Sequence, residues 1–264
     1  MAIYFSSGTT GTPKAIVHGV GPLLLSLSKE NIYHHEIGPN DTALQYTTTG
    51  WIMFLASISH LHQGARAVLY DGSPLFPDPA VLLKIMYMQK VTVLGTSPRW
   101  MFELMSKGIV PRQEYDLSKL RLVTSTGMVL PEQAFEWFYD KAFPRHVRLS
   151  NMSGGTDIAG NFVLGNPIAP VHAGGFSGGC LGTPMAVFDS ALPEGSEGYA
   201  MPNGLSGELV ATSAFPNMPL YFWGDEMPAP GPKYRDSYFS RFKNAWSQGD
   251  FCVIHEETGN VSIL

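Results

Sequence analysis

Short apolar strands alternate with helix-like stretches over the middle of this 264-residue chain, from residue 41 to residue 157. The strands are rich in small and β-branched side chains, and the stretches between them are long enough for helices. The expected strands span residues 43–46, 65–70, 91–94, 120–124 and 147–152, and the expected helices span residues 50–63, 79–89, 98–107 and 131–143. Strands that alternate with helices pair in parallel and place the helices on the faces of the sheet. The sequence therefore predicts an α/β fold with a parallel sheet flanked by helices.

The character of the sequence changes after about residue 174. Paired glycines and several prolines break the chain there, and short β-like runs such as residues 207–212 follow. Helical periodicity is nearly absent, apart from a short helix expected near residues 238–243. We therefore expect an α/β subdomain over residues 1–178 and a smaller β-rich subdomain over residues 179–264.

Composition and charge exclude several classes of function. The formal net charge of −5 provides no general basic face for nucleic acid, so an anionic ligand has to be held by local donors. Cys180 and Cys252 are too few for a disulfide framework and too far apart for a zinc site, which indicates free thiols in a reducing compartment. No apolar run approaches the ~20 residues that span a bilayer, and no secretion signal precedes the first strand. These features predict a cytoplasmic protein with no nucleic-acid or membrane partner.

Clusters rich in Gly, Ser and Thr each follow an expected strand. They lie at residues 6–11, 47–50, 95–97, 125–127 and 153–157. The carboxyl ends of parallel strands lie along one edge of a sheet, and ligands bind in the crevice at that edge. Together the clusters predict one broad polar site, although an ordinary loop is an alternative for any single cluster.

The strongest motif is Ser6-Ser7-Gly8-Thr9-Thr10-Gly11-Thr12-Pro13-Lys14. Its two glycines allow a tight backbone turn whose N–H groups converge on an anion. The hydroxyl groups add hydrogen-bond donors, and Lys14 adds a point charge suited to a polyphosphate. The spacing is not that of a Walker A loop, because a proline precedes the lysine. The motif therefore favours a phosphate-binding loop over a merely flexible one.

This segment resembles the signature loop of the adenylate-forming superfamily, which includes acyl-CoA synthetases, luciferases and the adenylation domains of peptide synthetases. Further motifs follow in the family's order. Gly154-Gly155-Thr156-Asp157 is similar to a motif that ends in Thr-Glu, and residues 204–209 are similar to a structural Gly-Glu-Leu strand. Gly249-Asp250 resembles a ribose-binding motif. The resemblance implies part of the large N-terminal domain of such an enzyme, with a distorted barrel as its β-rich part.

The resemblance also implies ATP, Mg²⁺ and coenzyme A as ligands. Lys14 and Thr156 would act on the phosphates as catalytic residues, and Asp157 would bind Mg²⁺. Asp250 would accept hydrogen bonds from both ribose hydroxyls, which suits a carboxylate. The nucleotide-binding residues implied in this way are Ser7, Gly8, Thr9, Thr10, Gly11, Lys14, Gly127, Met128, Gly155, Thr156, Asp157 and Asp250.

Within the superfamily the sequence most resembles the acetoacetyl-CoA synthetases, which join acetoacetate to coenzyme A, at residues 47–51, 69–74, 222–225, 234–236 and 246–250. The implied acyl-binding residues are Trp51, Met53 and Gly154. Acetyl-CoA synthetases have a tryptophan at the position of Gly154, and replacing an indole by hydrogen opens on the order of 150–250 Å² of contact surface. This implies an acid larger than acetate, while Trp51 is equally well explained by core packing.

Two positions depart from the family pattern. Asp157 has one carbon less than the usual glutamate, and Met128 replaces the glutamate of a Gly-Glu-Pro sequence.

Both ends of the chain look cut, and the resemblance implies that a first α/β half and a C-terminal domain are missing parts of the same enzyme. We therefore expect weak ATP binding and little turnover from this chain alone. A ligase for another short acid and a non-catalytic remnant remain alternatives.

Overall fold

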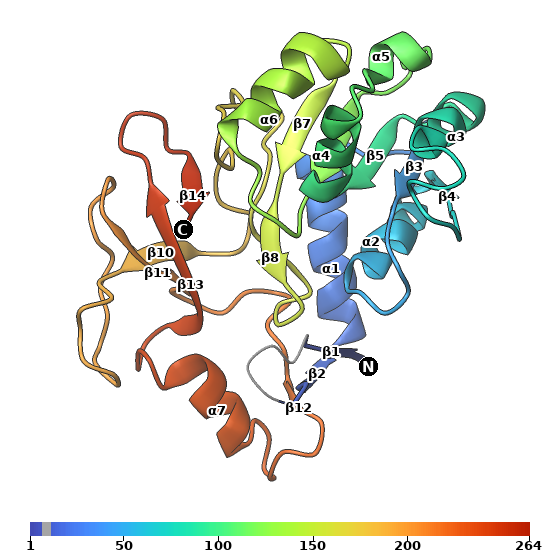
Figure 1. Ribbon diagram of the computed structural model, residues 1–264. Coiled ribbons are helices and arrows are strands. Elements are labelled where there is room, and N and C mark those ends of the chain that lie inside the picture. The colour runs from blue at the N-terminus through green and yellow to red at the C-terminus, as the bar shows by residue number, and fades with distance from the viewer. Residues whose placement is uncertain (7–11) are drawn as a thin grey trace. The chain divides into compact units, whose positions relative to one another are not determined.

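The computed structural model describes residues 1–6 and 12–264, which divide into two compact units (Figure 1). The α/β unit comprises Glu30–Ser153 and Leu164–Ser177, and the β-rich unit comprises Met1–Lys29, Gly154–Val163 and Gly178–Leu264. The sequence led us to expect two consecutive segments, 1–178 and 179–264. The structure also changes unit after Ser177, but it groups Met1–Lys29 and Gly154–Val163 with the β-rich unit.

A five-stranded parallel sheet forms the centre of the α/β unit, in the order β4-β3-β5-β6-β7. Its strands are β3 (Thr42–Gln45), β4 (Arg66–Val68), β5 (Val93–Thr96), β6 (Leu122–Ser125) and β7 (Arg148–Asn151). Each strand overlaps its expected range. Strands β5 and β6 are buried along their whole length, as is typical of central strands in a parallel sheet that is covered on both faces. The predicted parallel sheet is therefore confirmed.

Helices alternate with these strands, although most are shorter than the sequence indicated. They are α2 (Met53–Ser59), α3 (Val81–Gln89), α4 (Pro98–Ser106), α5 (Pro111–Glu114) and α6 (Glu132–Trp137), with a 3-10 helix η2 (His60–Gln63) and π-helices η1 (Glu30–His34) and η3 (Phe138–Ala142). Gly64 ends the 3-10 helix with a left-handed φ of 78°, as the C-terminal cap that the sequence predicts. Leu83 and Met86 of α3 share the buried core with Trp100 and Leu104 of α4.

The described residues of the β-rich unit form two antiparallel sheets, a hairpin and two helices. The first sheet has the order β1-β2-β12, with β1 (Ala2–Phe5), β2 (Ala15–His18) and β12 (Tyr221–Phe222). The second has the order β10-β11-β13-β14, with β10 (Met185–Phe188), β11 (Ser206–Ala211), β13 (Trp246–Ile254) and β14 (Val261–Ile263). The hairpin is formed by β8 (Ser153–Gly155) and β9 (Gly160–Val163), and the helices are α1 (Val20–Lys29) and α7 (Pro232–Phe239).

One expectation about the polar clusters is wrong. Ala2–Phe5 is a strand, but it pairs with β2 in an antiparallel hairpin, so the cluster at residues 6–11 does not follow a strand of the parallel sheet. The clusters at residues 47–50, 95–97 and 125–127 do lie at the carboxyl ends of β3, β5 and β6. The last cluster continues from β7 into β8.

The two helices of the β-rich unit also differ from expectation. Helix α1 was not predicted, because Gly21 and Pro22 near its start are typical of a turn. A proline in the first turn is nevertheless compatible with a helix, since its missing N–H would have no partner there. Helix α7 starts at Pro232 and ends at Phe239, whereas the sequence pattern indicated a start near residue 238.

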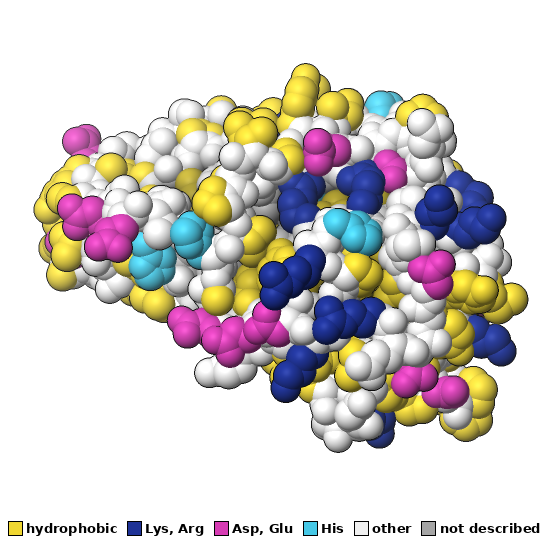
Figure 2. Space-filling model, turned by 90° about the horizontal axis from the view of Figure 1, so that it is seen from above, with side chains coloured by type: hydrophobic (Ala, Val, Ile, Leu, Met, Phe, Trp, Pro, Cys, Tyr) yellow, Lys and Arg dark blue, Asp and Glu magenta, His cyan; other side chains and the backbone are white. Residues whose placement is uncertain are grey.

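No helix in the described ranges is both long and apolar enough to cross a bilayer. Figure 2 shows Lys and Arg side chains gathered on part of one face, with Asp and Glu side chains among and beside them. A face with charges of both signs does not attract anions as a whole. On this face an anionic ligand therefore has to be bound by individual donors.

Candidate active site

The expected phosphate loop connects two strands that pair with each other. The Ser6 N–H donates to the Lys14 carbonyl at 3.0 Å, and the Lys14 N–H donates to Ser6 Oγ at 2.9 Å. These bonds fix the two ends of the loop at the top of the β1–β2 hairpin. The residues proposed to contact phosphate between them, Ser7, Gly8, Thr9, Thr10 and Gly11, lie outside the described residues.

Lys14 lies over two aromatic rings of the β-rich unit. Its Nζ is 5.6 Å from the centroid of the Phe222 ring and 5.4 Å from that of the Tyr238 ring. Both separations are within the range of a cation–π interaction, which attracts the ammonium group to the ring faces. The charge of Lys14 is therefore held beside β12 and α7.

Thr156 and Asp157 lie in the turn that joins β8 to β9. The buried Asn217 side chain donates from Nδ2 to the Ile158 carbonyl at 2.6 Å, which fixes the far side of this turn. His18, the last residue of β2, is 1% exposed and lies close to the backbone of Thr156 and Asn217. Burial lowers the pKa of His18, against the opposing effect of these backbone groups and of the Asp157 charge. Strand β2, which follows Lys14, therefore ends at His18, close to the turn that carries Asp157.

The hydroxyl of Tyr238 donates a hydrogen bond to Asp157, with 2.6 Å between the phenol oxygen and Oδ1. The Tyr238 side chain is 1% exposed, and its ring stacks on Trp246 at a centroid distance of 3.7 Å. Burial raises the pKa of Tyr238, and the negative charge of Asp157 raises it further. The phenol is thus a neutral donor, and a single tyrosine contacts both Lys14 and Asp157.

Asp250 lies at a bulge in β13. The register between β11 and β13 shifts between Glu208 and Val210, so β13 has extra residues at positions 248–250. Gly249 has a φ of 88°, a left-handed conformation that glycine adopts without strain and that is typical of such bulges. A bulge bends the strand and changes where its side chains point, which gives Asp250 an orientation that a regular strand would not.

The carboxylate of Asp250 is held by its neighbour Gln248, whose Nε2 donates to Oδ2 at 2.8 Å. Burial raises the pKa of Asp250, the hydrogen bond from Gln248 opposes this effect, and the negative charges of Asp157 and Glu208 raise the pKa further. Lys14, Asp157 and Asp250 all belong to the β-rich unit.

Glu208 has a structural role, as the resemblance implied for the Gly-Glu-Leu sequence. Its side chain is buried, Arg241 Nε donates to Oε2 at 3.0 Å, and the Ser247 hydroxyl donates to Oε1. Both carboxylate oxygens are therefore engaged within the protein. Glu208 stabilises the pairing of β11 with the segment around β13 and is not a ligand-binding group.

The structure corrects the argument that was based on Gly154. A side chain at this position would collide with the backbone of Gly160 and Asn161 in β9. The backbone of β9 therefore fills the space beside Gly154. The missing side chain opens no room for the extra carbons of a larger substrate. The neighbouring Gly155 is different, because a Cβ there would lie 3.6 Å from Gln248 Nε2, at ordinary contact distance. Gly155 therefore lies next to the residue that holds Asp250.

The remaining predicted site residues belong to the α/β unit. Trp51 precedes α2 and is 41% exposed, so the alternative of simple core packing does not account for it. Its ring lies against Gly127 after β6, where an added Cβ would be 2.9 Å from Trp51 Cη2. Met53 is the first residue of α2 and is half-buried, and Met128 is 53% exposed. This unit therefore brings together Trp51 and Gly127, one from the expected acyl set and one from the expected nucleotide set.

Replacing Gly127 with alanine is expected to lower the free energy of unfolding by about 1–3 kcal/mol, the usual cost of a left-handed non-glycine residue. The φ of Gly127 is 95°, and its Cβ would press on the Trp51 ring. Gly50→Ala is the matched control, because Gly50 lies in the same unit with no positive φ and no atom within 4 Å of a Cβ. Urea unfolding of both variants is the measurement, and equal midpoints would contradict the expectation.

A divalent cation fits the residues around Asp157. Mg²⁺ in nucleotide sites is held by one or two carboxylates together with substrate phosphates and water, and not by a cage of protein ligands. Among the described residues, no group of three or more His, Cys, Asp or Glu side chains is arranged to hold a metal ion. Asp157 and Lys14 both contact Tyr238, and the Asp157 side chain is a single carboxylate of the kind that such a shared site uses.

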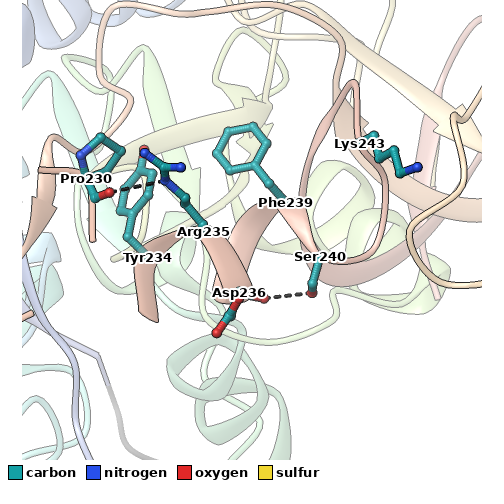
Figure 3. Close-up of a pocket in the computed structure, with 7 residues that line it drawn as sticks. All are labelled: Pro230, Tyr234, Arg235, Asp236, Phe239, Ser240 and Lys243. Carbon is teal, nitrogen blue, oxygen red and sulfur yellow. Dashed lines mark hydrogen bonds between the residues drawn. The ribbon is translucent and has the colours of Figure 1, made fainter. Parts of the chain in front are cut away.

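A separate surface pocket of about 470 Å³ lies along α7. Figure 3 shows its lining residues, which are Pro230, Tyr234, Arg235, Asp236, Phe239, Ser240 and Lys243. Two hydrogen bonds order this region, from Arg235 Nε to the Pro230 carbonyl at 3.2 Å and from the Ser240 hydroxyl to the Asp236 carbonyl at 2.7 Å. None of the predicted site residues lines this pocket.

Sequence reasoning missed the residues that hold the site together. Tyr238, Trp246 and Gln248 were given no role, although each contacts a predicted site residue or supports one that does. One signal was available for Tyr238, because Tyr234 and Tyr238 are four residues apart and therefore share one face of a helix. The helix itself was placed too late in the chain for this signal to be used.

Comparisons with curated proteins give several close relatives. The chain is 40% identical over 262 residues to an acetoacetyl-CoA synthetase of Gallus gallus, which covers 99% of this chain and 38% of that protein. It is 43% identical over 249 residues to an acetoacetyl-coenzyme A synthetase of Rhizobium meliloti (strain 1021), covering 94% of this chain and 37% of that protein. The chain thus spans little more than a third of the length of these relatives.

A solved structure and a family match agree with these relatives. The structure of acetoacetyl-CoA synthetase from Streptomyces lividans superposes with a TM-score of 0.89 at 35% identity, covering 99% of this chain and 39% of that one. The family described as AMP-binding enzyme matches residues 1–222. That match includes Lys14, Thr156 and Asp157, and it extends over most of the sequence. The chain therefore belongs to the AMP-binding enzyme family.

Proposed function

We propose that this chain is the nucleotide-binding part of an AMP-forming acid–thiol ligase that activates acetoacetate and transfers it to coenzyme A. The observation that carries the proposal is the grouping of Lys14, Asp157 and Asp250 in one compact unit. These are a cation for phosphates, a carboxylate for a metal ion and a carboxylate for ribose hydroxyls. A Mg²⁺-bound nucleotide has a partner for each of them: the phosphates, the metal ion and the ribose.

The proposed reaction has two steps. A carboxylate oxygen of the acid attacks the α-phosphorus of ATP and releases pyrophosphate, and the thiol of coenzyme A then attacks the acyl-adenylate and releases AMP. Mg²⁺ bound with the nucleotide would neutralise phosphate charge during the first step. Such chemistry depends on positioning and charge stabilisation more than on covalent help from the protein.

The predicted site residues of the β-rich unit each have a distinct proposed role. Lys14 neutralises the phosphates, with the backbone and hydroxyl groups of residues 7–11 as additional donors. Thr156 binds a phosphate oxygen through its hydroxyl, and Asp157 holds Mg²⁺. Asp250, oriented by the bulge at Gly249, accepts hydrogen bonds from the ribose.

In the α/β unit, Gly127 and Met128 are proposed to contact the adenine, and Trp51 and Met53 to line the acyl site. The identity of the acid is supported by the acetoacetyl-CoA synthetases to which the chain is similar. Acetoacetate is therefore the first acid to test. We also propose a cytoplasmic location, with which the buried free thiols of Cys180 and Cys252 are compatible.

Calorimetric titration of the purified chain with ATP, in the presence and absence of Mg²⁺, tests the proposal. Saturable, Mg²⁺-dependent binding is expected, and the absence of any binding would instead support a non-catalytic remnant. Because the chain spans 38% of the length of its relative from Gallus gallus, we expect turnover by this chain alone to be slow. Acetoacetyl-CoA formation at a typical enzyme rate of ~1–10³ s⁻¹ would contradict that expectation.

Pyrophosphate release across a panel of acids separates acetoacetate from other substrates. Acetoacetate is expected to stimulate release more than acetate, propionate or 3-hydroxybutyrate at equal concentration. A stronger response to one of the other acids would retain the ligase class and replace the proposed substrate.

A further inference from the structure

We propose that Tyr238 is a positioning residue that fixes the Asp157 carboxylate for cation binding and joins it to Lys14 in one unit. The inference rests on the proposed function, because it assigns a task to a residue beside the proposed metal ligand. It starts from the contact itself. The 2.6 Å separation between the phenol oxygen and Asp157 Oδ1 is that of a strong hydrogen bond to a charged acceptor. The bond uses one carboxylate oxygen and leaves Oδ2 for a cation.

The phenol is held firmly in place. Its ring stacks on Trp246 with an interplanar angle of 17°, and Phe222 and Tyr234 contact it edge-on at 5.5 Å and 5.2 Å between centroids. Aromatic contacts of this kind have specific geometries, so rotating the Tyr238 ring would disrupt several of them at once. A donor with so little freedom restricts its acceptor in the same way.

The hydroxyl of Tyr238 suits this task. A phenol O–H is a hydrogen-bond donor, and the Asp157 carboxylate accepts from it. The shorter side chain of Asp157 makes its placement more important, because an aspartate reaches less far toward a cation than a glutamate. Residues outside the first set of metal ligands commonly orient those ligands in this way.

The same ring also lies 5.4 Å from Lys14 Nζ. Tyr238 therefore contacts the cation proposed for the phosphates with its face and the carboxylate proposed for the metal with its hydroxyl. A nucleotide that binds Mg²⁺ needs these two charges at a fixed separation. The position of Tyr238 in α7 gives both groups a common support.

Tyr238→Phe tests the inference, because it removes the hydroxyl and keeps the stacked ring. The Mg²⁺ concentration for half-maximal ATP binding is expected to rise about 10-fold, the lower range for loss of a residue that orients a metal ligand. The affinity for ATP measured without Mg²⁺ is expected to stay the same. A general loss of structure would weaken both, so the difference between the two titrations identifies a positioning role.

Tyr234→Phe is the matched control. Tyr234 lies in the same helix and the same aromatic cluster, and its buried hydroxyl donates to the Pro219 carbonyl at 2.8 Å, away from Asp157. The Mg²⁺ concentration that the Tyr234→Phe variant needs for half-maximal ATP binding is expected to equal that of the unmodified chain. As a second variant, Asp157→Glu moves the carboxylate, and adding Tyr238→Phe to it is expected to have little further effect, because coupled residues are not additive.

The outcomes separate the inference from the proposed function. A selective Mg²⁺ defect in Tyr238→Phe supports the inference. If the unmodified chain binds Mg·ATP and Tyr238→Phe has the Mg²⁺ requirement of Tyr234→Phe, the inference is overturned and the proposed function stands. If the unmodified chain does not bind Mg·ATP, the proposed function fails and the inference fails with it.

Discussion

Replacing Lys14 with alanine is expected to weaken the binding of Mg·ATP about 10- to 100-fold, because a hydrogen bond to a charged group contributes about 1.5–3 kcal/mol. Lys14 ends the predicted phosphate loop, and its ammonium group is held over Phe222 and Tyr238. Removing it takes a positive charge from a region that also contains Asp157 and Asp250. Calorimetric titration with Mg·ATP measures the loss.

Lys243→Ala is the control for Lys14→Ala. Lys243 is an exposed lysine of the same unit and lines the separate pocket along α7. The Lys243→Ala variant is expected to bind Mg·ATP as tightly as the unmodified chain does. Equal affinities of the two variants would show that Lys14 does not bind the nucleotide, whereas a loss in both would indicate only a general effect of charge.

Replacing Trp246 with alanine is expected to lower the free energy of unfolding by about 3–5 kcal/mol, the usual cost of removing a large buried aromatic side chain. Trp246 is 1% exposed and contacts the rings of Tyr238, Tyr234 and Phe215. Its loss leaves a cavity beneath the residue that holds Asp157, so Mg²⁺-dependent ATP binding is expected to fall as well.

Urea unfolding of Trp246→Ala beside Trp223→Ala measures this effect. Trp223 is in the same unit but is 59% exposed, so its replacement is expected to change the stability by no more than about 0.5 kcal/mol, as is usual for surface substitutions. Similar losses in both variants would mean that burial of Trp246 is not what stabilises the unit.

The parallel sheet was predictable because its signal is local. Each strand from β3 to β7 is a short apolar run beside a helical stretch, and the chain order alone implies parallel pairing. Gly64 was also predictable as a cap, since a left-handed glycine commonly follows the last helical residue. These features require no knowledge of distant contacts.

The three-stranded sheet around β2 was not predicted, because part of its pairing joins strands far apart in the chain. Strand β2 pairs with β1 nearby but also with β12, where Tyr221 lies opposite Val17. No local pattern indicates a partner so far along the chain. For the same reason the sequence placed the loop before Lys14 at the edge of the parallel sheet, and the structure places its ends on an antiparallel hairpin.

Resemblance named Lys14, Asp157 and Asp250 as the charged residues of the site, and their roles stay predictions. The structure places all three in the β-rich unit. Resemblance did not identify Tyr238, whose role depends on how α7 packs against Trp246. The expectation for Gly154 was wrong for a related reason, because the space beside a missing side chain is filled by the backbone of Gly160.

The most direct test of the account is an experimental structure of the chain with Mg²⁺ and a non-hydrolysable ATP analogue. We predict that the phosphates contact Lys14, that Mg²⁺ is bound by Asp157, and that the ribose hydroxyls lie within hydrogen-bond distance of Asp250. A nucleotide bound elsewhere, with none of these three side chains in contact with it, would contradict the account.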